Sequence, residues 1–523
     1  MKKPPVRPLG LILGALVLAC SSSAGTGSSG AGAAGAVGGP AGAMGVAGGA
    51  AGATAAGSGG MGSAAGISGS SGGGASGGAG TAGGGAAGAA ATGASGAGGA
   101  VTPPSCEALG PEPAIPPACA TVMATKTISG GLPSDEAALD TAAIQAAIDS
   151  CAAGKAVRLA ANGTAAAFVS GALMLRAGVT LWIDAGVTLF SSRDPRDFEA
   201  VAGKCGGNDT GSSSCNALVN VKNAANAGVV GAGTIDGRGG EPVAGGSSTW
   251  WDLEKADAGN LVAPRLVQVT GGNGFVLYKV TLKNAPKFHV SIQSTVGFKV
   301  WGITIDTPGT APNTDGVDPA ASTNGVIAFS HISTGDDNIA IKGSGPPVVS
   351  QLVIAHNHFG KGHGMSIGSE TYGGVADVRV CDLSLDGTTN GLRIKSDSSR
   401  GGVVQRVTYS DVCMRDVANP LVFDAYYSTA TGTRLPDYHD ITARNVHVLG
   451  GGALTFRAYD ATHPLVLALD NIVFDSTPTI KYAQDAHLAL GPGPVSFDAS
   501  GTDVTSTRAA TVSEPPLDCT NAF

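Results

Sequence analysis

The chain has 523 residues, of which 13% are charged and 43% hydrophobic, and its formal net charge is −8. An acidic balance of this kind excludes a protein that binds nucleic acid through a basic surface. It also means that any polyanionic partner must be bound by a local cluster of basic residues.

Residues 1–20 have the pattern of an export signal. Lys2, Lys3 and Arg7 precede an apolar stretch over residues 9–19, which is too short to span a bilayer. The stretch ends in Val17-Leu18-Ala19-Cys20, which resembles the lipobox of bacterial lipoproteins. The resemblance implies that Cys20 is lipidated and that the protein is anchored at the outer-membrane surface or outside the cell. The alternative is ordinary cleavage and free secretion.

Residues 21–105 consist almost entirely of Gly, Ala and Ser, without one Asp, Glu, Lys or Arg. Such a segment has too little apolar side-chain surface to offset the entropy of ordering it, so we expect a flexible tether. A flexible chain of this length has a root-mean-square reach of roughly 50 Å. Residues 106–523 are then the folded domain.

Eight cysteines remain after Cys20, an even number that favours disulfides in an exported chain; they are Cys106, Cys119, Cys151, Cys205, Cys215, Cys381, Cys413 and Cys519. The short Gly/Ser-rich loop between Cys205 and Cys215 makes these two the best candidate pair. The spacing of the cysteines and histidines is not that of a zinc site, so we expect no metal.

The folded domain begins with one helical pattern and continues as short strands. Apolar residues have helical spacing over residues 140–148, where Asp140 is available as the N-cap. From Val157 onward we expect no helix but many strands rich in Val, Ile and Thr. A hydrophobic segment recurs about every 27 residues, around Val280, Ile303, Ile332, Phe359, Leu383, Val412, Val446 and Ile472. The repeat predicts an all-β fold, a right-handed parallel β-helix of about ten coils with a short N-terminal capping helix.

Four short motifs follow one another at about one coil each. They are Asn313-Thr314-Asp315, Gly335-Asp336-Asp337, Gly362-His363-Gly364 and Arg393-Ile394-Lys395. The successive gaps are 21 residues from Asp315 to Asp336, 27 from Asp336 to His363 and 30 from His363 to Arg393. Residues one coil apart stack at the strand spacing of about 4.8 Å, so the motifs should form one stripe roughly 15 Å long. That length suits a carbohydrate-binding cleft.

The residue types in the stripe favour glycoside hydrolysis. This reaction needs one protonated carboxyl group on the leaving oxygen and an ionised one that activates water. Three carboxylates within two coils repel one another, so one pKa should rise. Gly335 can provide the turn that lets Asp336 and Asp337 point the same way. Arg393 and Lys395 lie two apart, on one face of a strand, where they can hold a substrate carboxylate.

The four motifs resemble those of the polygalacturonases of glycoside hydrolase family 28. Further segments also resemble the family, and the likeness is closest to the bacterial endo-acting enzymes; they are residues 233–237 with Trp250-Trp251, residues 284–290, residues 364–370 and residues 390–397. The resemblance implies hydrolysis of the α-1,4-linked galacturonate of pectin with inversion and without a cofactor.

The resemblance also implies a role for each motif residue. Asp336 is the expected general acid, Asp315 and Asp337 hold and deprotonate the attacking water, and His363 tunes the protonation of the acid. Arg393 and Lys395 bind the galacturonate carboxylate, and Asn313 and a tyrosine also contact the substrate. Tyr427 matches that tyrosine, although the adjacent Tyr426 leaves the assignment open; Asn313 has the alternative of capping a turn.

Other functions remain as alternatives. An exo-polygalacturonase, or another pectin-backbone hydrolase such as a rhamnogalacturonan or xylogalacturonan hydrolase, has the same fold and chemistry. A pectate lyase needs calcium and an arginine base. Its mechanism would not use Asp336, Asp337 and His363. A non-enzymatic surface adhesin suits the tether but not the carboxylates. We therefore expect a monomeric endo-polygalacturonase with pectin as its partner.

Overall fold

The computed structural model describes residues 105–207, 214–257 and 261–523. The predicted signal, the lipidation site Cys20 and all but the last residue of the predicted tether lie outside these described residues. In the described part of the chain, none of the helices is both long and apolar enough to cross a bilayer.

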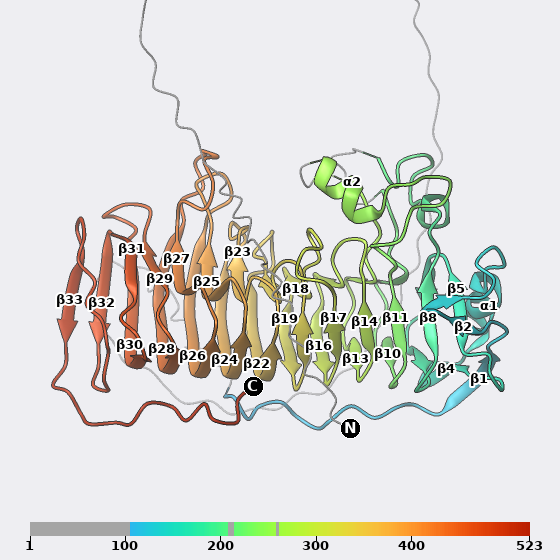
Figure 1. The fold of residues 1–523 in the computed structure, drawn as a ribbon, viewed down its shortest axis with the longest axis horizontal. Helices are drawn as coiled ribbons and strands as arrows, with labels where there is room; N and C mark the ends of the chain where they lie inside the picture. The colour runs from blue at the N-terminus through green and yellow to red at the C-terminus, as the bar shows by residue number, and fades with distance from the viewer. Residues whose placement is uncertain (1–104, 208–213, 258–260) are drawn as a thin grey trace, which may run out of the picture. The chain divides into compact units, whose positions relative to one another are not determined.

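One face of the domain is an 11-stranded parallel sheet (Figure 1). Its strands, in chain order and in order across the sheet, are β6 (Leu173–Leu175), β9 (Val219–Lys222), β12 (Val267–Thr270), β15 (Val290–Gln293), β18 (Val317–Ala320), β21 (Ile339–Ile341), β23 (Met365–Gly368), β25 (Asn390–Lys395), β27 (Asn419–Asp424), β29 (Ala453–Arg457) and β31 (Thr479–Gln484). Each coil of the solenoid contributes one of these strands, so the sheet records eleven coils where the sequence predicted about ten.

The other sides of the coils form a 20-stranded sheet. Its strands are β1 (Ala118–Met123), β4 (Lys155–Ala160), β5 (Ala167–Ser170), β7 (Val179–Ile183), β8 (Thr188–Ser191), β10 (Gly228–Val230), β11 (Thr234–Asp236), β13 (Val276–Tyr278), β14 (Thr281–Lys283), β16 (Val296–Trp301), β17 (Thr304–Asp306), β19 (Thr323–Ala328), β20 (His331–Ser333), β22 (Val349–Phe359), β24 (Val375–Asp386), β26 (Val403–Arg415), β28 (Asp437–Leu449), β30 (Leu465–Phe474), β32 (Ala486–Leu490) and β33 (Thr505–Arg508). The hairpin β2 (Ile128–Ser129) and β3 (Leu132–Pro133) is antiparallel.

A bend in each coil explains the recurring sequence pattern. In the bend the backbone passes through one residue with positive φ, such as Lys279 (φ 61°), Asp382 (φ 47°) or Asp411 (φ 57°). The next residue, for example Leu383, is apolar and packs in the core. Of the eight predicted recurrence points, six directly follow a positive-φ residue, and the repeat is therefore confirmed as a parallel β-helix; the six are Val280, Ile303, Leu383, Val412, Val446 and Ile472.

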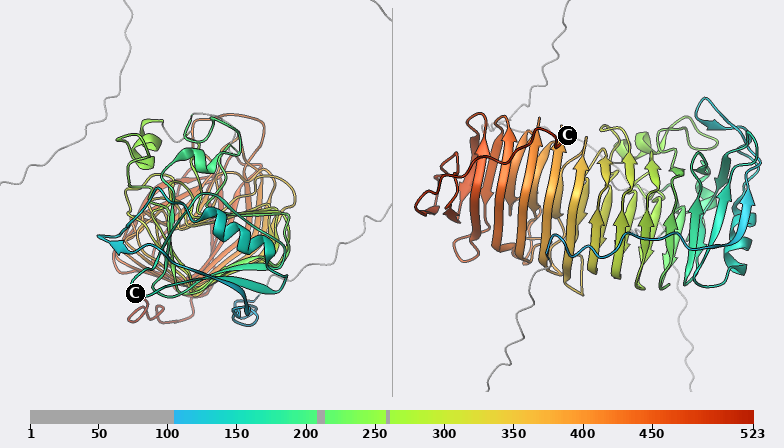
Figure 2. Two further views of the ribbon diagram at one scale, coloured as in Figure 1. Left: turned by 90° about the vertical axis from the view of Figure 1, so that its right-hand side faces the viewer. Right: turned by 90° about the horizontal axis from the view of Figure 1, so that it is seen from below.

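Aliphatic side chains fill the tube that the coils enclose, which Figure 2 (left) shows end-on. Successive coils stack residue on residue: Val267 of β12 pairs with Val219 and with Val290. Side chains alternate along a strand, so the residue that follows each of these valines on its own strand faces outward. The outer face of the 11-stranded sheet is therefore a regular array of positions one strand spacing apart.

Within the described residues, two α-helices and one 3₁₀ helix accompany the strands. The predicted capping helix is confirmed as α1 (Thr141–Ser150), but its cap differs, because the carboxylate of Asp140 makes an ion pair with Lys126 and accepts from the backbone of Val169. The expectation of no helix after Val157 is wrong. The 3₁₀ helix η1 (Pro195–Phe198) and the helix α2 (Trp250–Ala256) interrupt the strands, and Thr249 and Asp252 form a capping box that starts α2.

Both ends of the described chain are bonded to neighbouring strands. The pair Cys205–Cys215 is confirmed, and the other disulfides are Cys119–Cys151, Cys106–Cys381 and Cys413–Cys519. Cys381 lies on β24 and Cys413 on the adjacent β26. Figure 2 (right) shows the N-terminal segment crossing the outside of the strands from this point to β1. The two terminal segments therefore meet on the same part of the 20-stranded sheet.

Candidate active site

The four sequence motifs converge on the outer face of the 11-stranded sheet. Ser366 of β23 pairs with Arg393 of β25, and Gly368 pairs with Lys395 in the same register. The aspartates and His363 lie in the loops that lead into β18, β21 and β23. The predicted stripe is confirmed, since each loop sits one coil from the next.

Asp336 and Asp337 lie in the loop between β20 and β21, not on a strand. Gly335 makes this loop possible, because a Cβ there would lie 1.9 Å from the carbonyl oxygen of Ala311. Position 335 therefore requires glycine because the backbone of the preceding coil approaches it closely. The loop leaves Asp336 partly exposed and buries Asp337.

His363 contacts Asp336 as predicted. Its Nδ1 is 3.0 Å from Oδ1 of Asp336, and its backbone N–H donates to the Asp336 carbonyl oxygen over 2.9 Å. The same carboxylate oxygen accepts from the Asp337 backbone N–H at 2.8 Å. These contacts hold Asp336 in one orientation with its carboxyl group toward solvent.

Arg393 and Lys395 are bonded to Asp337 rather than left open for a substrate. The Lys395 ammonium donates to Asp337 Oδ2 over 2.9 Å, and the Arg393 guanidinium donates to Oδ1. Ser366 also donates to Oδ1, at 3.0 Å, and accepts from Arg393 Nε. The predicted local basic cluster therefore exists, and one buried carboxylate, that of Asp337, neutralises part of it.

Asp315 belongs to a second buried ion-pair network. Lys342 Nζ lies 3.2 Å from Asp315 Oδ2 and 2.8 Å from Asp318 Oδ2, and it sits 4.4 Å from the centre of the Phe288 ring. The backbone carbonyl of Asp315 accepts from the ring of His289, whose pKa burial lowers to about 4. His289 is therefore a neutral donor that fixes the Asp315 loop.

The pKa values of the aspartates separate in this site. Burial, only partly offset by Lys342, raises the pKa of Asp315 well above its usual value and that of Asp318 to about 6. Burial also acts on Asp336, but the hydrogen bond and charge of His363 and the charge of Lys395 outweigh it and lower its pKa to about 2. The expected rise therefore falls on Asp315 and Asp318, and Asp336 is ionised at neutral pH.

Tyr427 and Asn313 have distinct positions. Tyr427 is exposed, and Lys395 Nζ lies 4.9 Å from its ring centre. Tyr426 instead stacks on Tyr459 one coil further along, at 5.7 Å between ring centres. Of the two tyrosines, Tyr427 is thus the one beside the motif residues. The Asn313 amide donates to the buried Glu254 of α2, so Asn313 also connects this helix to the site.

Asp336, Asp337 and His363 bring ligand atoms within 4.8 Å of one another. A metal ion there would have to compete with Arg393 and Lys395, which already occupy both oxygens of Asp337. The fixed positive charges make this cluster a poor cation site.

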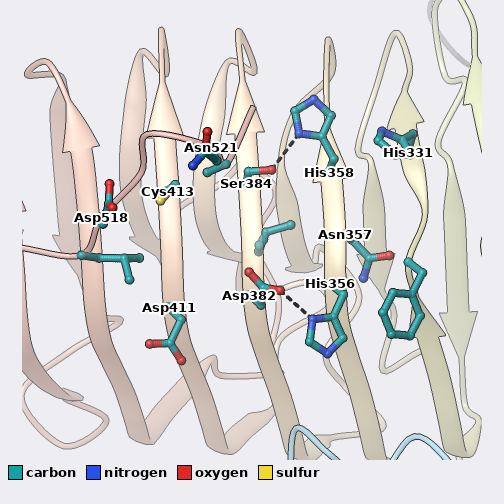
Figure 3. Close-up of a pocket in the computed structure, with 14 residues that line it drawn as sticks. His331, His356, Asn357, His358, Asp382, Ser384, Asp411, Cys413, Asp518 and Asn521 are labelled. Atoms are coloured by element: carbon teal, nitrogen blue, oxygen red, sulfur yellow. Dashed lines mark hydrogen bonds and ion pairs between the residues drawn. The ribbon is translucent and has the colours of Figure 1, made fainter.

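A separate cavity of about 510 Å³ lies where β20, β22, β24 and β26 bend, beneath the C-terminal segment (Figure 3). His356 contacts Asp382 there at 2.6 Å, and His358 contacts Ser384 at 2.7 Å. None of the residues of the four motifs lines it. This cavity is therefore separate from the site where the motif residues gather.

Sequence reasoning missed four residues of the site: Asp318, Lys342, Ser366 and Glu254. A signal existed for Ser366, which precedes Arg393 by one coil of 27 residues. Asp318 follows Asp315 by three residues on β18, and Lys342 follows Asp337 by five residues, directly after β21. Their closeness in sequence to the motif aspartates was the available signal. Glu254 gave no signal, because its partner Asn313 is 59 residues away.

Comparisons with known proteins agree with this geometry. The family model described as glycosyl hydrolases family 28 matches residues 132–464. The chain is 45% identical over 486 residues to a polygalacturonase of Ralstonia nicotianae, covering 79% of this chain and 91% of that protein. It is 43% identical over 377 residues to an endo-polygalacturonase of Pectobacterium carotovorum subsp. carotovorum, covering 71% and 90%. The solved polygalacturonase from Erwinia carotovora ssp. carotovora is similar in structure, with a TM-score of 0.64 at 38% identity, covering 76% of this chain and 98% of that one.

Proposed function

The chain belongs to glycosyl hydrolases family 28 and has polygalacturonase activity, and from this premise we propose that it cuts polygalacturonate internally and with inversion. The observation that carries the proposal is the stripe of Asp315, Asp336, Asp337 and His363 beside Arg393 and Lys395. Carboxylates supply the acid and base of glycoside hydrolysis, and the two cations suit a substrate that bears a carboxylate on every sugar.

In the proposed reaction Asp336 gives its proton to the glycosidic oxygen as the bond from that oxygen to the anomeric carbon breaks. A water molecule attacks the anomeric carbon from the opposite face and passes a proton to Asp315 or Asp337. Attack from the opposite face converts the α-linkage into a β-anomer at the new reducing end.

Substrate binding prepares both groups in this mechanism. Arg393 and Lys395 both donate to Asp337, so a galacturonate carboxylate that accepts these hydrogen bonds instead releases the Asp337 oxygens to hold water. The same exchange screens Lys395, one of the charges that lower the pKa of Asp336. The pKa of Asp336 then rises, and the acid gains the proton that it must donate.

The arrangement of the coils favours internal cleavage over exo action. The motif residues lie near the middle of the 11-stranded sheet, with four strands before β18 and several after β25. Outward-facing polar and aromatic residues continue on both sides, from Gln268 of β12 to Arg457 of β29. A long polysaccharide can therefore be bound on both sides of the cleaved bond.

We also propose that the protein is an exported monomer, anchored by a lipid on Cys20 at the outer-membrane surface or outside the cell. The basic residues before the apolar stretch of residues 9–19, the lipobox-like ending and the uncharged residues 21–105 support this. Mass spectrometry of the membrane fraction should find acylated Cys20. Unmodified protein in the medium would favour free secretion instead.

The main test uses purified protein and polygalacturonate in excess chelator. Reducing ends, ultraviolet absorbance and viscosity are recorded together, and NMR reads the anomer of the first product. We expect reducing ends without absorbance, an early fall in viscosity and the β-anomer, all lost in Asp336→Asn. Slow viscosity loss with release of monomer or dimer would overturn internal cleavage, and an α-anomer would overturn inversion.

A further inference from the structure

A second pocket, of about 290 Å³, opens on the outer face of the 11-stranded sheet over β9, β12 and β15. Its lining consists of amides, hydroxyls, two cations and one disulfide sulfur; the residues are Cys215, Asn216, Asn220, Lys222, Asn223, Arg265, Gln268, Thr270, Ser291 and Gln293. Among the residues that the structure describes, the lining includes no carboxylate, although acidic residues outnumber basic ones by 39 to 31 in the whole chain. Such a surface suits a ligand with hydroxyl groups and negative charge.

The pocket lies in register with the active site. Asn220, Gln268 and Ser291 are paired neighbours across β9, β12 and β15, and Ser291 pairs with Asp318 of β18. Asn220 is therefore three strands from Asp318, a distance of about 14 Å at the usual strand spacing, and Lys222 is in register with Ala320 of the same strand through Thr270 and Gln293. A linear chain of pyranose rings advances by about one strand spacing per sugar. A polymer lying along this face would reach the pocket about three sugars from the cleaved bond.

The pocket combines a fixed floor with an accessible cation. The side chain of Asn220 is buried and bonded to the backbone of Ala217 and Leu173, so it does not move. Lys222 is exposed, and its ammonium donates to Asn216 Oδ1 over 3.2 Å. A carboxylate can accept from the same ammonium without the removal of a charged partner. Gln293, exposed at the end of β15, provides an amide for a sugar hydroxyl.

We propose that this pocket is a distal binding site for one uronate residue of the polysaccharide, with Lys222 on its carboxylate and Gln293 on its hydroxyls. The proposal rests on the proposed function, because it assumes that the polymer lies along the 11-stranded sheet. It assigns to residues outside the four motifs a role in substrate length preference.

The test compares Lys222→Gln and Gln293→Leu with the wild-type protein on galacturonate trimer, hexamer and polymer. A trimer is too short to occupy the pocket and the cleavage point together. Because Lys222 is exposed, loss of its ion pair with the substrate should lower kcat/KM on hexamer and polymer about two- to fivefold in Lys222→Gln, with less effect in Gln293→Leu. Activity on trimer should stay unchanged. Lys155→Gln, on β4 of the other sheet, is the matched control for loss of one positive charge.

Bond-cleavage frequencies on end-labelled hexamer provide a second measurement, which does not require trimer to be cut. Loss of the site should change which hexamer bond is cleaved most often. Equal loss on trimer and polymer, or an unchanged hexamer pattern with unchanged kcat/KM, would overturn the proposal. Failure of the wild-type protein to cut polymer internally would instead overturn the proposed function, so the two failures are distinguishable.

Discussion

Replacing Lys342 with methionine should shift the pH dependence of the reaction. The ammonium lies 3.2 Å from Asp315 Oδ2 and 2.8 Å from Asp318 Oδ2. At 3.2 Å and an effective dielectric constant of about 20, one such attraction amounts to about 5 kcal/mol. Because 1.36 kcal/mol corresponds to one pKa unit, the loss of Lys342 could raise the pKa of Asp315 by at most roughly 4 units. Lys342 pairs with both Asp315 and Asp318, and its loss affects both carboxylates. We therefore expect the pKa of Asp315 to rise by about half of this maximum.

The sign of the effect follows from the role of Asp315 as a base. A protonated Asp315 cannot accept a proton from water, so the acidic limb of kcat/KM should move to higher pH by about 2 units in Lys342→Met. The raised pKa also makes the folded variant bind protons more tightly than the unfolded chain. Its stability should therefore be closest to wild type at low pH and fall as pH rises through the raised pKa, by about 3–5 kcal/mol at neutral pH.

The assay is kcat/KM on polygalacturonate between pH 3.5 and 8, with thermal unfolding at pH 5 and 7. Lys126→Met is the matched control, because Lys126 is also buried and makes an ion pair of 2.8 Å with Asp140, beside α1 at the N-terminal end of the solenoid. An acidic limb that stays in place while the rate falls would refute the reasoning. It would mean that Lys342 supports the fold of the site but does not limit the pKa of Asp315.

Three further predictions concern other parts of the structure. His363→Ala removes the hydrogen bond and charge that lower the pKa of Asp336, so the basic limb of kcat/KM should move to higher pH; an unchanged limb in the same titration would contradict this. Gly335→Ala places a Cβ against the Ala311 carbonyl and should reduce kcat at least a hundredfold, with correct folding checked by circular dichroism. Cys106→Ser opens the disulfide to β24 and should cost about 2–5 kcal/mol in urea unfolding, with little change in kcat.

The repeat made most of the site predictable from sequence. In a solenoid, sequence distance converts directly into position along the axis, so gaps of about one coil placed Asp315, Asp336, His363 and Arg393 together. The same rule cannot say what a side chain contacts within its coil. It therefore missed that Arg393 is bonded to Asp337, and that burial raises the pKa of another aspartate than the expected acid.

Features that depend on segments leaving the regular coil were harder to predict. The helix α2 has a recognisable capping box, Thr249 with Asp252, but its seven residues are too few for a clear apolar period. The disulfide Cys106–Cys381 spans 275 residues, and only the folded path of the N-terminal segment brings the two together. Cys205–Cys215 was predictable because its loop is short.

The disulfide between Cys106 and Cys381 also determines how the molecule responds to a pull on residues before 105. Tension that enters at Cys106 passes through the disulfide into β24, in the middle of the solenoid, and residues 107–380 form a closed loop that carries none of it. In the oxidised protein the first coils, beginning with β1, cannot be peeled away one at a time. After reduction the same pull would act on β1 and unwind the domain from its N-terminal end.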